Sequence, residues 1–181
     1  FDSTRAFIRL YVGDQFHWSS IRVRPEDARL LHDAGWNTRK ITRLDQIQSE
    51  EQRLLNYMEN NGYPFARISL DSVRFDGGAL SAVVKIEKGP LYKIDSIRIY
   101  GHARISSSFM ERYLGIPKGS IYRKDQLESI SRRIRELPYV QEEHPWSVTM
   151  LGTGSILDLY LKPKRSSQVD VLVGFLPNND Q

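Results

Sequence analysis

Hydrophobic and polar residues alternate along several short stretches of the chain, and one interruption of this alternation occurs twice. In residues 92–99 the apolar positions are Tyr92, Ile94, Ile97 and Ile99, so one position is skipped after Ile94. The same skip occurs in residues 16–23 after Trp18. A strand that changes its apolar face in mid-run needs a bulge, because a slip of one residue reverses the buried side. The shared interruption predicts a tandem repeat at an offset of 76 residues.

Each copy continues with the same order of predicted elements, which is strand, helix, helix, strand, strand. The first copy predicts strand 16–23, a short helix from Pro25 to Gly35, a helix over 44–60, and strands 65–75 and 80–86. The second copy predicts strand 92–99, a helix from Ser106 or Ser108 to Gly115, one helix over 125–137, and strands 146–151 and 157–161. A capping box of Ser108 and Glu111 is expected at the helix before Gly115. The fold class is therefore α+β, as tandem βααββ units with a three-stranded sheet covered by two helices.

Two features single out the second strand of each copy. Pro64 and Pro145 each stand just before that strand, and proline is tolerated at sheet edges but not in central strands. The strands that begin at Phe65 and Trp146 are therefore predicted to be edge strands. In the first of them the apolar alternation shifts near Asp71-Ser72, which predicts a bulge.

The repeat also predicts the domain boundaries. Residues 1–12 match the closing strand of a preceding unit, 13–89 form one unit, and 90–165 form the next. Residues 166–181 contain an alternating apolar stretch at 169–175, the pattern and length of one strand of a membrane barrel. We expect this stretch to be the start of such a strand.

Composition narrows the function classes. The chain has 181 residues, 40% hydrophobic and 27% charged, which is typical of globular domains. It contains no cysteine, so it offers no thiol nucleophile, thiolate metal site or disulfide. The four histidines lie in separate segments without metal-ligand spacing, and no nucleophile elbow or phosphate-binding glycine loop occurs. We expect no enzyme activity, metal or cofactor, and the net charge of +4 does not require a nucleic-acid partner.

Several motifs together resemble POTRA domains. The motifs in the second copy are Gly89-Pro90-Leu91-Tyr92, Ile97-Arg98-Ile99-Tyr100-Gly101, Tyr113-Leu114-Gly115-Ile116-Pro117 and Leu137-Pro138-Tyr139-Val140. Those in the first copy are Gly13-Asp14-Gln15-Phe16 and Asn61-Gly62-Tyr63-Pro64-Phe65-Ala66. The first copy departs from the pattern at Arg24-Pro25, where the family has the glycine that matches Gly101.

The resemblance implies a periplasmic role beside an outer-membrane barrel, as in BamA-like and TamA-like assembly factors. Such arrays receive unfolded outer-membrane proteins or accessory assembly subunits and pass them to the barrel of the same full-length chain. The physical route is β-augmentation, in which an extended guest pairs with a free sheet edge. The expected guest-binding residues are Phe65, Arg67, Ile68, Ser69, Leu70, Val73, Trp146, Val148 and Met150. The repeated glycine-to-aromatic seam leaves no linker residues between the copies, which predicts a tight junction between units at Gly13, Phe16, Trp18, Gly89, Pro90 and Tyr92.

Three alternatives stay open at this point. The two units match the length of the arrays in two-partner secretion transporters. A KH-like RNA-binding module also begins strand–helix–helix–strand, but Gly115 and Gly119 are one residue too far apart for its Gly-x-x-Gly clamp. A pure spacer role requires only that the units are joined without slack, and it is compatible with guest binding.

Overall fold

The computed structural model describes residues 17–37 and 43–164, so the expectations for 1–12 and 166–181 lie outside the described range. The chain divides into two compact units between Leu91 and Tyr92, and each unit has its own sheet and hydrophobic core. Within the described ranges, no helix combines the length and the apolar character needed to cross a membrane.

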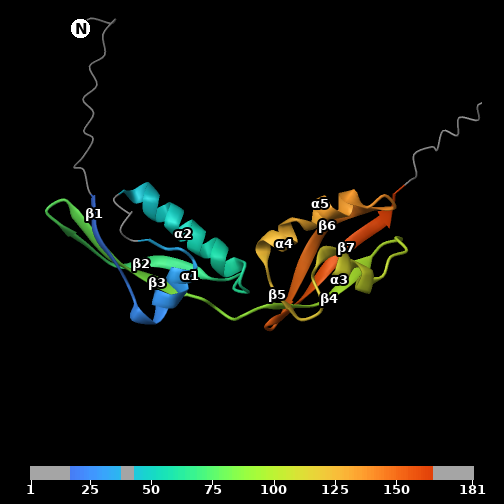
Figure 1. Ribbon diagram of the computed structural model, residues 1–181, viewed down its shortest axis with the longest axis horizontal. Helices are drawn as coiled ribbons and strands as arrows, with labels where there is room; N and C mark the ends of the chain where they lie inside the picture. The colour runs from blue at the N-terminus through green and yellow to red at the C-terminus, as the bar shows by residue number, and fades with distance from the viewer. Residues whose placement is uncertain (1–16, 38–42, 165–181) are drawn as a thin grey trace, which may run out of the picture. The chain divides into compact units, whose positions relative to one another are not determined.

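The first unit has the predicted βααββ order (Figure 1). Its elements are β1 (His17–Val23), η1 (Pro25–Asp27), α1 (Ala28–Asp33), α2 (Leu44–Glu59), β2 (Arg67–Asp76) and β3 (Ala79–Glu87). The sheet order is β1-β3-β2, with β1 parallel and β2 antiparallel to β3. The prediction of a three-stranded sheet is confirmed for this unit.

Local signals in the sequence explain where these helices begin and end. Pro25 opens the first turn, and Glu26 and Asp27 follow it, where carboxylates complement the positive end of the helix. The turn is a 3₁₀ helix that runs directly into α1, and Gly35 ends it with a φ of +70°. Since Arg24 is extended and Pro25 starts the helix at once, this unit needs no glycine at the place of Gly101.

Both helices of the first unit cover the same face of its sheet, as Figure 1 shows for α2. The residues that pack together from α2, α1 and the position just after α1 are buried to 9% exposure or less, and they are Leu31, Ala34, Leu54 and Met58. A smaller cluster joins β1, α2 and β3 through Trp18, Ile47 and Ala82. Burial of these apolar side chains is the main favourable term in the stability of the unit.

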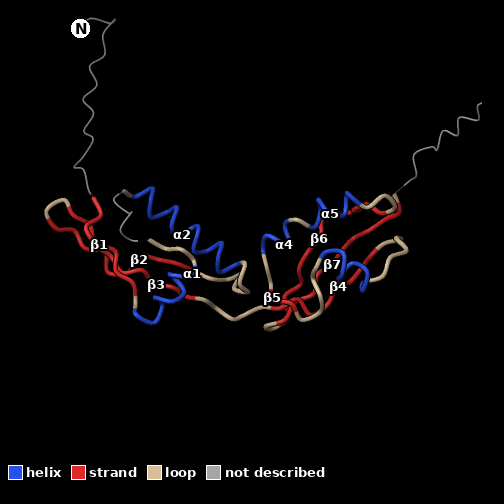
Figure 2. The backbone as a smooth tube through the Cα atoms, viewed as in Figure 1, coloured by secondary structure: helices blue, strands red, loops and turns tan. Residues whose placement is uncertain are grey.

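The second unit repeats this plan with one additional strand (Figure 2). Its elements are β4 (Lys93–Tyr100), α3 (Ser107–Leu114), β5 (Ser120–Ile121), α4 (Lys124–Glu128), α5 (Ile130–Glu136), β6 (Val140–Leu151) and β7 (Gly154–Pro163). The sheet order is β5-β4-β7-β6, so the expectation of three strands is wrong here. The additional strand β5 pairs with Lys93 and Ile94, and two residues are too few to give a periodic pattern.

Two helix predictions for the second unit are corrected by the structure. The single helix expected over 125–137 is divided into α4 and α5 at Ser129, whose hydroxyl donates to the carbonyl of Gln126 at 2.7 Å. The cap of α3 is Ser106, whose Oγ accepts from the amide of Phe109 at 3.2 Å. Ser108 lies inside the helix, so the expected capping box is wrong.

The repeated skip in the apolar alternation corresponds to a repeated irregularity in strand pairing. The register of β1 against β3 shifts between Trp18 and Ser20, and that of β4 against β7 shifts between Ile94 and Ser96. The two shifts lie 76 residues apart, as the sequence predicts. The second unit buries one continuous core that includes Ile94, Ile97 and residues of α3, α4, α5 and β7.

Candidate functional site

The second strand of each unit is an edge strand. β2 lies outside β3 in the first sheet, and β6 lies outside β7 in the second, so each has a neighbouring strand on one side only among the described residues. The return strands β3 and β7 are central, as the sequence predicts. An edge strand leaves alternate backbone N–H and C=O groups without a ladder partner, which makes it a template for an incoming strand.

The edge formed by β2 is interrupted by the predicted bulge. Its register against β3 shifts between Asp71 and Arg74, where Ser72 and Val73 together oppose the single residue Ala82. Ser72 adopts a φ of +53°, and its amide donates to its neighbour's carboxylate, Asp71 Oδ1, at 2.7 Å. The extra residue bends the strand and divides the edge into two short segments.

The two segments of β2 present different side chains. In the first segment Ile68 and Leu70 are half-buried and pack against the cores of the unit. In the second segment Val73 and Phe75 lie on the same face of the strand but are 43% and 67% exposed. Phe65, just before the strand, is 53% exposed. Together these three side chains place exposed apolar surface along an open edge, which is typical of interaction sites.

The other predicted guest-binding residues of β2 carry polar side chains. Arg67 and Ser69 are exposed and alternate with Ile68 and Leu70, so they lie on the opposite face of the strand. Arg74 and Asp76 continue this polar face after the bulge. The edge therefore has one apolar and one polar side.

The edge formed by β6 differs from its prediction. The strand begins at Val140 rather than at Trp146, so Pro145 lies inside it. Proline fits there because β6 is an edge strand and because its register shifts on both sides of His144. Pairing is regular over two short runs, Val140–Glu142 and Ser147–Leu151, so the edge of β6 is interrupted.

The predicted binding residues of β6 face mainly inward. Trp146 and Val148 are half-buried and pack against the core of the second unit. Met150 is also half-buried, whereas Leu151 is 55% exposed. This edge thus shows less apolar surface than β2.

The residues predicted at the junction between units occupy varied places. Gly13 and Phe16 lie outside the described residues. Trp18 is buried inside the first unit, where it packs with Ile47 and Ala82. Gly89 has a φ of +68°, a conformation that favours glycine, and Pro90 is exposed.

Tyr92, the last of the predicted junction residues, is 8% exposed, and its carbonyl accepts from the amide of Tyr122 at 3.0 Å. That bond fixes the start of the second unit. A role of these residues in joining the units stays a prediction.

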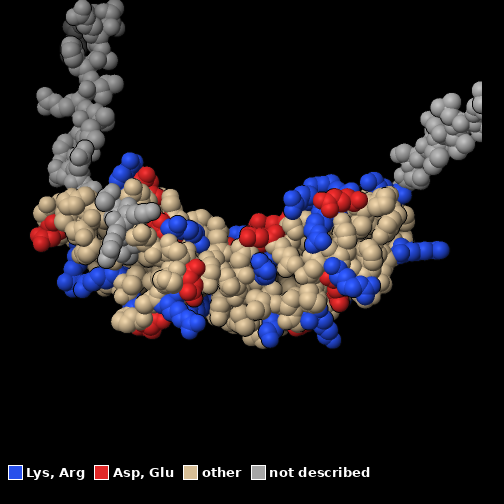
Figure 3. Space-filling model, viewed as in Figure 1, with Lys and Arg blue, Asp and Glu red and all other residues tan. Residues whose placement is uncertain are grey.

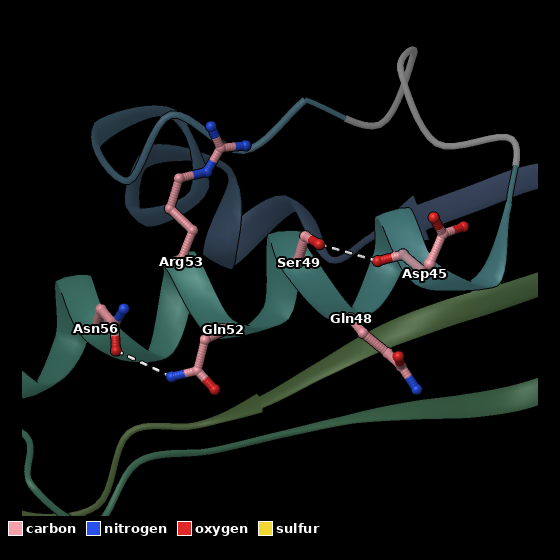
Figure 4. A pocket seen from close by; sticks show the side chains of 6 residues that line it. All are labelled: Asp45, Gln48, Ser49, Gln52, Arg53 and Asn56. Atoms are coloured by element: carbon pink, nitrogen blue, oxygen red, sulfur yellow. Dashed lines mark hydrogen bonds between the residues drawn. The ribbon is translucent and has the colours of Figure 1, made fainter.

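A hollow of about 620 Å³ lies along the polar face of α2 and has no reactive centre (Figure 4). It is lined by six polar residues of that helix, Asp45, Gln48, Ser49, Gln52, Arg53 and Asn56. Two of its polar groups bond within the helix: Ser49 Oγ donates to the carbonyl of Asp45, and Gln52 Nε2 donates to Asn56 Oδ1, both at 2.9 Å. Because its walls come from one exposed helix face, we interpret it as solvated surface.

Metal binding and RNA binding find no support in the described geometry. No group of three or more His, Asp or Glu side chains is placed to hold a metal ion among the residues described. The loop from Gly115 to Gly119 is tied to the sheet, since the amide of Gly119 donates to the carbonyl of Ile94 at 2.7 Å. That contact occupies one backbone amide of the loop.

The structure also brings together polar residues that the sequence does not indicate. Asp158 of the central strand β7 is 3% exposed and lies between β4 and β6. Its Oδ1 accepts from Arg98 Nε at 3.0 Å, and its Oδ2 accepts from Thr149 Oγ1 at 2.7 Å. These bonds link three adjacent strands and fix their register. The only sequence signal is an aspartate in an otherwise apolar strand.

The arginines at 132, 133 and 135, which look like one basic group in the sequence, have different environments. Arg133 donates through Nη1 to the carbonyl of Leu114 at 2.5 Å and through Nη2 to that of Tyr113, at the carboxyl end of α3. Its guanidinium also lies 5.0 Å from the centre of the Tyr113 ring. Arg133 therefore caps a helix, whereas Arg132 and Arg135 are exposed.

The carboxylate of Glu136 and the guanidinium of Arg133 both act on the pKa of Tyr113. The Tyr113 hydroxyl donates to the carbonyl of Arg133 at 2.7 Å and approaches Glu136 Oε2 at 3.4 Å. Partial burial first, and the nearby Glu136 carboxylate second, raise the pKa of Tyr113. This cluster joins α3 to α5.

Comparison with known proteins agrees with the fold. Residues 92–145 match the family model POTRA, described as a surface antigen variable number repeat. No curated protein matches the chain. Two of the similar solved structures are BamA from Haemophilus ducreyi lacking POTRA domains 1–3 and BamA POTRA3–5 from Haemophilus influenzae.

The first of these structures has a TM-score of 0.62 and 14% sequence identity, over 82% of this chain and 30% of that chain. The second has a TM-score of 0.56 and 17% identity, over 83% of this chain and 62% of that chain. The chain thus spans less than two thirds of either structure. The similarity shows that the described units have the POTRA fold.

Proposed function

We propose that this chain, in which residues 92–145 form a POTRA domain, is the non-enzymatic periplasmic part of an outer-membrane assembly or translocation factor. Its role is to receive unfolded outer-membrane polypeptides or accessory subunits by β-augmentation and to position them at a barrel. The observation that carries this proposal is the open edge of β2, which shows exposed apolar side chains at Val73 and Phe75.

Pairing with a sheet edge suits a site that must accept many sequences. Backbone hydrogen bonds to the edge supply affinity that does not depend on the guest's side chains. The exposed side chains of Val73 and Phe75 then favour guests with apolar residues at alternate positions, because neighbouring strands place such side chains next to each other. No reactive group is needed for this function.

β2 is the better candidate of the two edges. The edge of β6 contains Pro145, and its register shifts on both sides of His144. β2 pairs regularly over Arg67–Asp71 without a proline, and it has exposed apolar side chains at Val73 and Phe75 after its bulge. We therefore expect a guest to occupy β2 first, with β6 as a weaker site.

A nuclear magnetic resonance titration of the full chain tests this proposal. The probe is a peptide with alternating apolar residues taken from an outer-membrane barrel strand. We expect the amide signals of residues 67–76 to shift with saturation, and those of 147–151 to shift less. A peptide of equal length with prolines at alternate positions is the control, since it cannot form the ladder.

Variants distinguish peptide binding at the edge of β2 from non-specific hydrophobic binding elsewhere on the surface. Val73→Lys and Phe75→Lys place charges on the apolar side of β2 and are expected to weaken peptide binding by about tenfold each, as charged residues do on protected edges. Ile121→Lys is the matched control, because Ile121 is 45% exposed and lies on the short strand β5. Equal binding by all three variants, or no shifts along β2, contradicts the proposal and leaves only a spacer role.

A further inference from the structure

The end of the second unit at which β4 and β7 finish contains a small hollow. The two strands are parallel, and Tyr100, the last residue of β4, pairs with Tyr160, three residues before the end of β7. The chain then turns at Gly101, and the amide of Ala103 donates to the carbonyl of Leu161 at 3.3 Å. The hollow measures about 230 Å³ and is lined by His102, Arg104, Tyr139, Val140 and Pro163.

The lining combines a rigid apolar wall with two nitrogen-bearing side chains. Val140 is 2% exposed and pairs with Pro163 in the sheet, and the amide of Lys164 donates to the carbonyl of Tyr139 at 3.0 Å. His102 and Arg104 are exposed, and neither forms an ion pair with another described residue. The walls are therefore fixed by the backbone, while the guanidinium and the imidazole remain available to a ligand.

Charge at this end of the unit favours an anion. In residues 92–164 there are 12 Lys and Arg against 8 Asp and Glu, whereas the described residues of the first unit have 9 against 10. Lys162, on β7, and Lys164 directly precede and follow Pro163, which is one of the lining residues. The acidic side chain that approaches the loop is Glu143, which offsets part of this charge. Figure 3 shows Lys and Arg side chains spread over the visible face of this unit, with Asp and Glu side chains between them.

The position of the hollow in the chain indicates where the anion comes from. Lys164 is followed after four residues by the alternating stretch that begins at Val169, which we expect to enter a membrane barrel. Five residue steps span at most about 18 Å. The proposed attachment to an outer-membrane barrel, on which this inference rests, then places the hollow close to the bilayer surface.

We propose that this hollow binds the phosphate of an anionic lipid headgroup at the membrane surface. The Arg104 guanidinium provides paired donors that match phosphate oxygens, and His102 provides another. Lys162 and Lys164 add long-range attraction to a negatively charged surface. A volume of about 230 Å³ is smaller than the roughly 300–1,000 Å³ of pockets that enclose whole small molecules, so it suits a headgroup whose acyl chains stay outside.

Binding of the full chain to vesicles tests this proposal. The vesicles contain either phosphatidylcholine alone or phosphatidylcholine mixed with phosphatidylglycerol, and a third arm uses inorganic phosphate in solution. The test variant removes one cation that lines the hollow and two that flank the lining residue Pro163 in the sequence: Arg104→Gln, Lys162→Gln and Lys164→Gln. The control variant removes three exposed cations elsewhere in the unit: Lys93→Gln, Arg112→Gln and Lys118→Gln. Both variants keep the same net charge and the same residues 165–181.

We expect the unmodified chain and the control variant to bind the anionic vesicles, and the test variant to lose affinity on the order of a hundredfold. Amide shifts at His102 and Tyr139 should accompany binding. Equal affinity of the two variants overturns the proposal, as does a response to inorganic phosphate without any preference for anionic vesicles. Either result leaves the proposed guest binding at β2 untouched, because the peptide titration reports on the other unit.

Discussion

At the scale of single residues, Gly101 shows how one backbone position determines a junction between elements. It has a φ of +97°, and a Cβ placed on it would lie 2.3 Å from the carbonyl oxygen of Leu161. The chain turns here directly beside the end of β7. Only glycine meets both requirements, because it tolerates positive φ and has no side chain.

The first prediction concerns Gly101→Ala. We expect it to lower the free energy of unfolding of the second unit by about 3 kcal/mol or more, since backbone strain of roughly 1–2 kcal/mol adds to a clash with rigid backbone. Gly119→Ala is the control, because Gly119 has a φ of +78° but nothing within 4 Å of the added Cβ. Urea unfolding measures both, and equal losses contradict the role assigned to the contact with Leu161.

The second prediction concerns Glu51 of α2. Partial burial raises the pKa of Glu51. The folded state therefore holds this proton more tightly than the unfolded state, so stability falls as the pH rises through the interval between the unfolded and the folded pKa. We expect Glu51→Gln to stabilise the first unit at neutral pH and to lose this advantage below the unfolded pKa. Urea unfolding of the unmodified chain and of Glu51→Gln at several pH values checks this expectation. A difference between their free energies of unfolding that does not change with pH contradicts it.

At the scale of elements, the bulge in β2 limits the tendency of this edge to pair with a second copy of the chain. A long regular edge invites self-association, and a bulge is one of the devices that prevent it. Ser72 is the additional residue, held by its φ of +53° and by the bond from its amide to Asp71. The neighbouring apolar side chains remain exposed, so the edge stays accessible to a guest.

The third prediction follows from the register at this bulge. Deletion of Ser72 leaves Val73 opposite Ala82 and joins the two segments of β2 into one regular strand. We expect the deletion to increase self-association of the chain, measured by analytical ultracentrifugation, and to strengthen binding of the barrel-strand peptide. Ser72→Gly keeps the additional residue and relieves its positive φ, so it should behave like the unmodified chain. A deletion variant that associates no more than Ser72→Gly contradicts this role.

The sequence predicts those elements whose signal is local or repeated. The two register shifts, the bulge at Ser72, the edge position of β2 and β6, and the ends of α1 and α3 at Gly35 and Gly115 all agree with the structure. Each depends on alternation, proline or glycine, and the second copy of the repeat supports several of them.

The features that the sequence does not predict depend on contacts between distant segments. β5 exists because Ser120 and Ile121 meet β4, which no local pattern indicates. The break at Ser129 leaves the apolar face of Leu127, Ile130 and Ile134 unchanged, so periodicity does not detect it. The hollow beside Arg104 and the bonds of Asp158 form only when strands from different parts of the chain pair.

At the scale of the whole molecule, the two units have unequal cores. The described buried residues of the second unit form one cluster of 13 that involves helices and sheet, whereas those of the first unit form clusters of three and four. More continuous burial of apolar surface gives greater stability. We expect the first unit to unfold first, which suits a unit whose edge receives guests, because binding elements are often drawn from the less stable parts of a protein.

The fourth prediction tests whether the units unfold separately. Leu54 and Ile134 occupy matching places in the repeat and are 1% and 0% exposed, so each truncation to alanine leaves a cavity and costs about 2–5 kcal/mol. In calorimetry, Leu54→Ala should lower only the first transition and Ile134→Ala only the second. Hydrogen exchange assigns each transition, through faster exchange in β3 or in β7. If either variant lowers both transitions equally, the chain unfolds as one cooperative body, and guest binding at β2 is then coupled directly to the stability of the second unit.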